Sequence, residues 1–300
     1  MSGFISSLGR AELLALASSL LFSGTLVFLR QGMRSGTPLA AVLVINACVS
    51  AGGFAGALLR GTLMGSSSAP LLWFAAMGLV GPGVGSIFRM VAVERMGLNR
   101  STLIASSTPI WGTLLAVFVL GEEPSPRVIL GTMLIVGGVS MLVFEGGEGA
   151  GDFRSWLRSA LIFPIVASLA YAIAPVFTKL AYAYQQTPMV GLGVSFAVGN
   201  FLLFATKPLL PGGGRIHAPR RSLAWFALGG VFNLSAAICF MTALTFGEVS
   251  SILPVSRLTP LWVVLLSAVF LRRLERLTWL IALAAAMVVA GGVMITVSSG

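Results

Sequence analysis

The segments Thr108-Pro109-Ile110-Trp111 and Thr259-Pro260-Leu261-Trp262 lie 151 residues apart in equivalent apolar surroundings. Further matches follow in the same order along the chain: Phe28 with Phe177, Arg30 with Lys179, Thr37-Pro38 with Thr187-Pro188, Gly97 with Gly247, and Gly137-Gly138-Val139 with Gly291-Gly292-Val293. The offset grows from 149 to 154, and each step falls at or near a connection, as in a duplicated unit with small loop insertions. The chain is therefore predicted to be two copies of one unit.

The composition is that of an integral membrane protein. Hydrophobic residues make up 57% of the 300 residues, charged residues make up 9%, and the mean hydropathy is +0.97. Soluble domains carry about 25% charged residues. The net charge of +10 comes from basic residues scattered in short connections between apolar runs, where they contact anionic lipid head groups. The lipid bilayer is thus an expected partner, and nucleic acid is not.

The apolar runs predict how the chain crosses the membrane. One crossing takes about 20 apolar residues, so the chain allows roughly ten. The predicted crossings are 12–30, 38–59, 70–94, 101–120, 127–145, 157–181, 188–206, 222–246, 249–271 and 276–298. A glycine-rich acidic stretch in the middle of the chain cannot bury apolar surface and is predicted as a linker over 147–154. It separates repeat 1–146 from repeat 155–300.

Five crossings per repeat have a consequence for the architecture. Because five is odd, the second repeat enters the membrane from the opposite side. The predicted fold is an all-α polytopic membrane protein with ten transmembrane helices, arranged as two inverted five-helix repeats around a central cavity. Such a duplication favours alternating access, with Pro109 and Pro260 as symmetric hinges. Pro82 and Pro175 are interpreted as packing kinks.

The charges inside the predicted crossings are unusual. All nine acidic residues lie at span ends or in loops, which argues against drug export coupled to protons by a membrane-embedded glutamate. Arg257 lies nine residues after Glu248, about 13 Å along a helix and near the midplane. It either binds a substrate carboxylate or is held by the carbonyls freed around Pro254 and Pro260. Arg89 is expected to extend to the membrane surface.

The polar and titratable side chains of the sequence do not indicate an enzyme. The sole histidine, His217, lies in a loop, and no buried carboxylate could partner a serine nucleophile. The sequence therefore predicts no catalytic residues, no cofactor and no metal site. A non-transporting scaffold remains an alternative, although it gives no reason for an inverted duplication.

Two segments and their surroundings carry a resemblance to a known family. These are Ser107-Thr108-Pro109-Ile110-Trp111 and Leu258-Thr259-Pro260-Leu261-Trp262, each followed by a helix with Gly-Gly-Val, and Gly121-Glu122 after the first of them. The chain resembles the ten-helix, EamA-like branch of the drug/metabolite transporter superfamily, and within it the bacterial exporters of aromatic and other amino acids.

The resemblance implies a function and a set of site residues. It implies export of amino acids or amphipathic metabolites across the inner (plasma) membrane by a monomer, with a proton-coupled multidrug or cation exporter as the alternative. It places a cavity between the repeats. The candidate substrate-binding residues are Ser19, Phe22, Phe88, Ser106, Thr108, Tyr171, Phe240 and Arg257.

The chain departs from the family pattern in two places. The second repeat has Leu271-Arg272-Arg273 where the first has Leu120-Gly121-Glu122, so the Gly-Glu motif survives in one repeat only. The small polar side chains of Ser106 and Thr108 lie where an aromatic-selective site would carry larger rings. A broader substrate range is therefore expected.

The charge distribution and the resemblance predict opposite orientations. Odd-numbered connections hold 13 Lys and Arg residues, whereas even-numbered connections and the termini hold only Arg10, Arg60, Arg127 and Lys179. The positive-inside rule then places both termini outside the cytoplasm, whereas the resemblance implies that they are inside. We follow the charge distribution, because it is a property of this chain.

Overall fold

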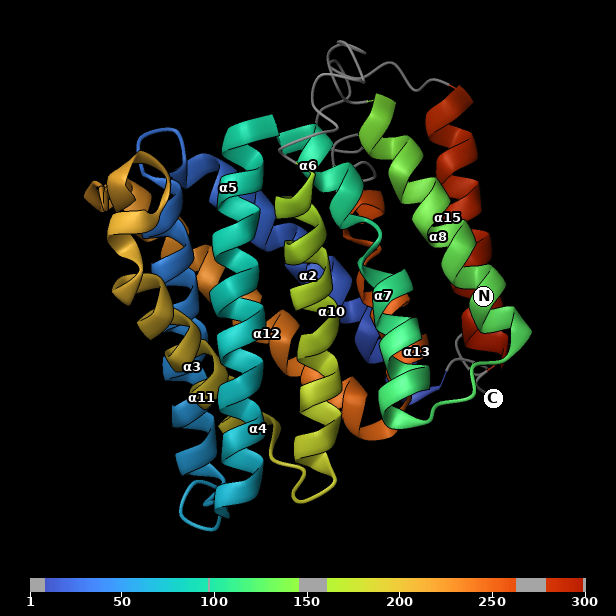
Figure 1. The fold of residues 1–300 in the computed structure, drawn as a ribbon, viewed down its shortest axis with the longest axis horizontal. Coiled ribbons are helices and arrows are strands. Elements are labelled where there is room, and N and C mark those ends of the chain that lie inside the picture. The colour runs from blue at the N-terminus through green and yellow to red at the C-terminus, as the bar shows by residue number, and fades with distance from the viewer. Residues whose placement is uncertain (1–8, 97, 146–160, 263–278, 299–300) are drawn as a thin grey trace.

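The computed structural model describes residues 9–96, 98–145, 161–262 and 279–298, and all regular elements in these ranges are helical (Figure 1). The first half contains α2 (Arg10–Gly32), α3 (Pro38–Leu59), α4 (Ser68–Gly78), the π-helical η1 (Leu79–Gly85), α5 (Ser86–Met96), α6 (Leu98–Ala105), α7 (Thr108–Leu115), the π-helical η2 (Ala116–Leu120) and α8 (Pro126–Glu145). The second half contains α10 (Ile162–Tyr182), α11 (Pro188–Ala205), the 3-10 turns η3 (Lys207–Leu209) and η4 (Pro211–Gly214), α12 (Arg220–Phe246), α13 (Val249–Ser256) and α15 (Trp279–Ser298).

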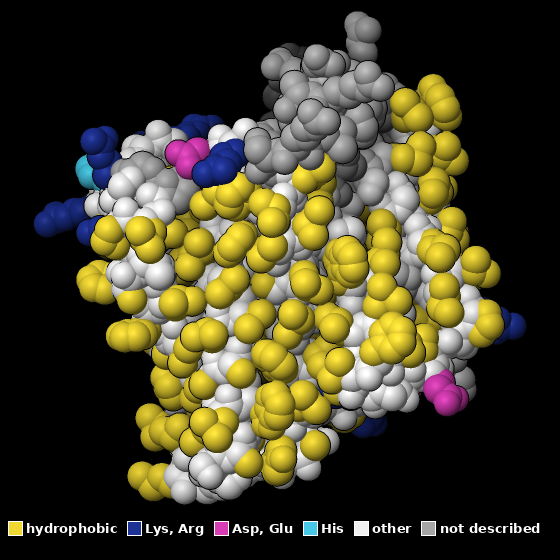
Figure 2. Space-filling model, in the orientation of Figure 1, with side chains coloured by type: hydrophobic (Ala, Val, Ile, Leu, Met, Phe, Trp, Pro, Cys, Tyr) yellow, Lys and Arg dark blue, Asp and Glu magenta, His cyan; other side chains and the backbone are white. Residues whose placement is uncertain are grey.

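The described helices are those of a multi-pass membrane protein. Six of them are long and apolar enough to cross a bilayer: α2, α3, the stretch Ser68–Arg95, α10, α11 and α12. Shorter apolar helices cover Thr108–Leu120, Pro126–Met141 and Leu283–Thr296. Figure 2 shows hydrophobic side chains over the middle of one face. The all-α prediction is confirmed for the described part, whereas the count of ten crossings stays a prediction, because the linker 147–154 and residues 263–278 lie outside it.

Hydrogen bonds between connections show that the two halves run in opposite directions. At one end, the Thr37 amide donates to the His217 carbonyl at 2.9 Å, so α2 ends beside the start of α12. At the other end, Gln185 Nε2 donates to the Gly65 carbonyl at 3.3 Å, so α10 ends beside the start of α4. The equivalent helices α2 and α10 are therefore antiparallel, as inverted repeats require.

The two ends of the bundle differ in charge. The first, which carries connections 33–37 and 206–219, is called the basic end. Its exposed Lys and Arg residues include Arg30, Arg34, Arg95, Arg215, Arg220 and Arg221. The opposite end, which carries connections 60–67, 121–125, 183–187 and 247–248, is called the Glu122 end.

The main helix contacts join one half to the other. α2 packs on α12, α10 packs on α4, η1 and α5, α3 packs on α11, and α8 packs on α15. In two of these pairs the backbones touch, because a Cβ on Gly53 would collide with Gly193 and one on Gly131 would collide with Gly291. Small residues allow such close approach in membranes. The core of the molecule is thus the interface between its halves.

The predicted fourth crossing of each half is interrupted within its described part. The sequence predicted one run over 101–120, but α6 begins at Leu98 and ends at Ala105, and a new helix starts at Thr108. In the second half α13 ends at Ser256 and helix resumes at Thr259. Pro109 and Pro260 each occupy the second position of the resumed helix, where a missing N–H group breaks no hydrogen bond. The repeated Thr-Pro therefore starts a half-helix.

A carboxylate holds the halves together at the Glu122 end. Gly121 adopts a left-handed conformation with φ of 69°, which is strained for residues with a side chain. The turn brings Glu122 to the first turn of α13, where its carboxylate oxygens accept hydrogen bonds from the Val249 and Ser250 amides at 2.9 Å each. A negative charge at a helix N-terminus is stabilising. The Gly-Glu motif is thus a cap that one half places on the other.

We expect Glu122→Ala to lower the free energy of unfolding by about 1–2 kcal/mol, because it leaves two buried amides without acceptors. Thermal unfolding of the purified protein in detergent micelles measures the change. The control is Glu123→Ala, whose side chain is exposed next to Glu122 and which should leave the transition within error. Equal shifts for the two variants would show that the cap contributes no stability.

Candidate functional site

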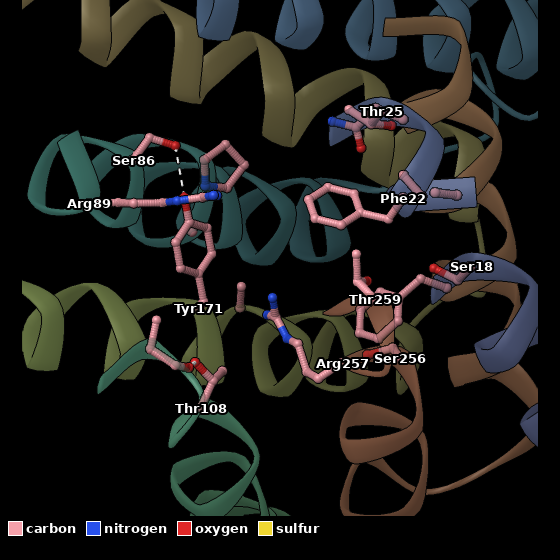
Figure 3. Close-up of a pocket in the computed structure, with 18 of the residues that line it drawn as sticks. Ser18, Phe22, Thr25, Ser86, Arg89, Thr108, Tyr171, Ser256, Arg257 and Thr259 are labelled. Carbon is pink, nitrogen blue, oxygen red and sulfur yellow. Dashed lines mark hydrogen bonds between the residues drawn. The ribbon is translucent and has the colours of Figure 1, made fainter. Parts of the chain in front are cut away.

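A cavity of about 390 Å³ lies between the two halves (Figure 3). It is lined by residues of both helix breaks and of α2, α3, α4, η1, α5, α6, α7, α8, α10, α11, α12 and α13. From the breaks it extends toward the basic end as far as Leu29 and Arg89. It therefore occupies the place between the repeats where inverted-repeat carriers hold substrate.

The bundle is packed tightly on the other side of the breaks. Gly112 of α7 lies so close to α13 that a Cβ there would collide with the Leu253 side chain. Val249, Ile252 and Leu253 are at most 1% exposed. Because the Glu122 cap holds the start of the same helix, the cavity is closed toward the Glu122 end by α7 and α13.

Each broken helix is bonded to the first helix of the other half. In the first break, the hydroxyls of Ser107 and Thr108 lie 3.1 and 3.0 Å from the hydroxyl of Ser168 on α10. In the second, Trp262 Nε1 donates to Ser19 Oγ on α2 at 2.8 Å, and Thr259 Oγ1 donates to the Ser19 carbonyl at 3.3 Å.

The two serines occupy equivalent positions in the repeats. Ser19 and Ser168 are separated by the same 149 residues as Phe22 and Tyr171, and both serines are 0% exposed. A hydroxyl buried at this depth needs hydrogen-bond partners. The two serines therefore make symmetric contacts, in which the first helix of each half holds the helix break of the other half.

A double-mutant cycle tests this connection. We expect Ser19→Ala and Trp262→Phe to be coupled by about 0.5–1.5 kcal/mol, the size of an interhelical hydrogen bond in a membrane. The free energy of unfolding in mixed micelles measures it. Ser195 is equally buried but donates to the Gly191 carbonyl of its own helix at 2.6 Å, so Ser195→Ala should add to Trp262→Phe without coupling. Coupling of equal size in both cycles would contradict the assignment.

Arg257 stands at the second break, beside Tyr171. Its Cζ atom lies 5.9 Å from the centroid of the Tyr171 ring, within reach of a cation–π interaction. The tyrosine is fixed from the opposite side, because its hydroxyl lies 3.0 Å from Ser86 Oγ and its ring packs on Gly85. Buried Arg257 Nε has no hydrogen-bond partner among the described residues, so the freed carbonyls around Pro254 do not occupy it.

Six of the eight candidate residues line the cavity, and two do not. Phe88 packs against Phe163, with ring centroids 5.9 Å apart, and Ser19 lies buried between α2 and the second break. The six on the wall are Phe22, Ser106, Thr108, Tyr171, Phe240 and Arg257. The proposed hinges Pro109 and Pro260 also lie on the wall. The part of each residue in binding stays a prediction.

The structure adds Arg89 to the residues of the cavity wall. The sequence predicted that this side chain extends to the membrane surface. Arg89 is on the cavity wall, three residues after Ser86 on the same face of α5. The π-helical η1, with Pro82 inside it, precedes this helix. One extra residue in a turn rotates everything after it by about 100° relative to a regular α-helix. Helical periodicity could therefore not place Arg89.

The cavity wall offers positive charge and hydrogen-bond donors. It carries Arg89 and Arg257, and no Asp or Glu among the described residues lines it. Three of its residues have buried polar atoms without a partner in the described part of the chain: Thr25 Oγ1, Asn46 Nδ2 and Arg257 Nε. Such groups are costly unless a ligand or water satisfies them. The wall is suited to a small molecule that carries anionic oxygen atoms.

Comparison with known proteins identifies the same duplicated unit. The sequence matches the EamA-like transporter family twice, over residues 9–144 and over residues 158–297. One solved crystal structure of a protein shares the fold, with a TM-score of 0.79 and 20% sequence identity. The match covers 96% of this chain and 97% of the other. A search of curated proteins finds no match.

Proposed function

Because the chain belongs to the EamA-like transporter family, we propose that it exports small carboxylate-bearing metabolites, aromatic and other neutral amino acids among them, across the inner (plasma) membrane. Members of this family are transporters rather than enzymes. The observation that carries the proposal is Arg257, a guanidinium with an unpartnered Nε in a cavity between the two halves. Monomeric function is part of the proposal.

Arg257 would receive the carboxylate of the substrate. A guanidinium binds a carboxylate through two parallel hydrogen bonds, which fixes orientation as well as position. Phe22, Tyr171 and Phe240 line the same cavity and supply apolar contact for a side chain. Ser106 and Thr108 contribute small polar side chains to the same wall, which is compatible with a range broader than aromatic amino acids.

Transport would follow from the inverted repeats. The described state has its cavity extended toward the basic end and closed at the Glu122 end. Exchange of the two nearly equivalent packings, with Pro109 and Pro260 as hinges, opens the opposite side. The positive-inside rule places the basic end in the cytoplasm, so the described cavity is the one that loads a substrate for export.

A proton-coupled exporter of cationic drugs is the less favoured alternative. That mechanism needs a membrane-embedded carboxylate to attract the cation and exchange protons. The described part of the cavity wall carries two guanidinium groups and no carboxylate, which repels a cationic substrate.

Substitution of Arg257 tests the binding role. We expect Arg257→Gln to reduce counterflow of labelled phenylalanine and threonine in proteoliposomes about 10- to 100-fold, because one charge-assisted contact is lost. Arg257→Lys should retain part of the flux, since it keeps the charge but not the bidentate geometry. Arg30→Gln, an exposed arginine at the end of α2, is the matched control. Unchanged flux in Arg257→Gln, or no carrier-dependent flux of any amino acid in the wild type, would refute the proposal.

Terminal reporter fusions test the orientation. If the basic end is cytoplasmic, both termini face the periplasm, and a C-terminal alkaline phosphatase fusion should be active whereas a green fluorescent protein fusion stays dark. The reverse pattern would place the basic end outside and make the described cavity outward-facing.

A further inference from the structure

The charge of the cavity exceeds what one carboxylate can balance. Arg89 and Arg257 both line it, and the described part of the wall holds no Asp or Glu. Two guanidinium groups that line one small cavity repel each other, and the buried Nε of Arg257 is costly if it stays without a partner. A substrate with one carboxylate and one ammonium group adds no net negative charge.

The two arginines are arranged around Tyr171. Arg257 lies toward the face of the tyrosine ring, with Cζ 5.9 Å from the centroid. The tyrosine hydroxyl is 3.0 Å from Ser86 Oγ, and Arg89 lies one helical turn after Ser86. In the view of Figure 3, Arg89 crosses the hydroxyl end of Tyr171, and Arg257 lies beside the ring. They are therefore two cationic groups on one wall, each of which can bind an anionic group.

The remaining unsatisfied groups on the wall also favour an anion. Asn46 Nδ2 and Arg257 Nε are buried, have no partner among the described residues and can only donate hydrogen bonds. An acceptor-rich ligand satisfies both. A ligand group with donors alone, such as an ammonium, satisfies neither.

We propose that the cavity takes substrates with two carboxylates, namely acidic amino acids and short dicarboxylates, with one carboxylate on Arg257 and the other on Arg89. This assignment rests on the transport function proposed above and names its preferred substrate class. Arg89 is exposed, on the part of the wall toward the basic end, whereas Arg257 stands at the helix break. The substrate therefore lies along the cavity, and Arg89 selects for the second negative charge.

Glutamate and glutamine provide the test, because they have nearly the same shape and differ by one negative charge. In proteoliposomes the wild-type protein should exchange labelled glutamate at least about tenfold more efficiently, in kcat/KM, than labelled glutamine or phenylalanine. Succinate should compete with glutamate. In Arg89→Gln the KM for glutamate should rise at least about tenfold, with glutamine and phenylalanine changed less than about twofold, and Arg89→Lys should restore most of the preference.

Arg30→Gln, which removes one positive charge from the same end of the bundle, controls for the general potential and should keep the preference. Thermal stabilisation in detergent gives a readout besides transport, and glutamate should raise the melting temperature of the wild type but not of Arg89→Gln.

The outcomes separate this inference from the proposed function. Flux of phenylalanine or glutamine that depends on Arg257 but shows no preference for glutamate would overturn the dicarboxylate assignment and leave amino acid export standing. An equal loss of all substrates in Arg89→Gln would show that Arg89 acts on the fold rather than on selection. No exchange of any of these compounds by folded protein would overturn both.

Discussion

The two breaks in the fourth crossings are possible only because other groups satisfy the chain there. Backbone polar groups freed inside a bilayer cost several kcal/mol each unless protein or water satisfies them. At the first break the hydroxyls of Ser107 and Thr108 donate to the Ile104 and Ala105 carbonyls at 2.7 and 2.6 Å. Ser168 on the other half lies within hydrogen-bond distance of both hydroxyls and can donate its single O–H to one of them. The opposite repeat therefore adds a hydrogen bond to a break whose carbonyls are satisfied by its own hydroxyls.

This dependence explains why the site lies where it does. A helix that stops at the centre of the bundle exposes the residue that follows it to the space between the halves, and in the second repeat that residue is Arg257. In the first repeat the equivalent position is Ser106, whose hydroxyl lies 2.8 Å from Ser140. The repeats thus share a fold, but only the second repeat carries a charged residue at its helix break. The duplicated fold accounts for the two helix breaks, and the sequence difference between the repeats accounts for Arg257 at only one of them.

The Glu122 cap is a second asymmetry with the same origin. It joins connection 121–125 to the first turn of α13 through two amides, and the second repeat carries Arg272-Arg273 at the matching place. A cation cannot accept hydrogen bonds from a helix N-terminus. The two ends of the carrier are therefore not chemically equivalent, and the cavity of the described state lies toward the end opposite the cap.

Much of this molecule could be predicted from the sequence alone. Order-preserving matches and hydropathy indicated the duplication, the membrane class and the repeated Thr-Pro. The spacing of Arg257 from Glu248 predicted that it lies near the midplane, and this depth stays a prediction. These features depend on the chain itself. Only the tertiary structure decided that Ser19 holds Trp262 and that Arg89 faces the cavity. Those outcomes depend on a π-helical turn and on contacts between residues up to 243 positions apart, which helical periodicity does not encode.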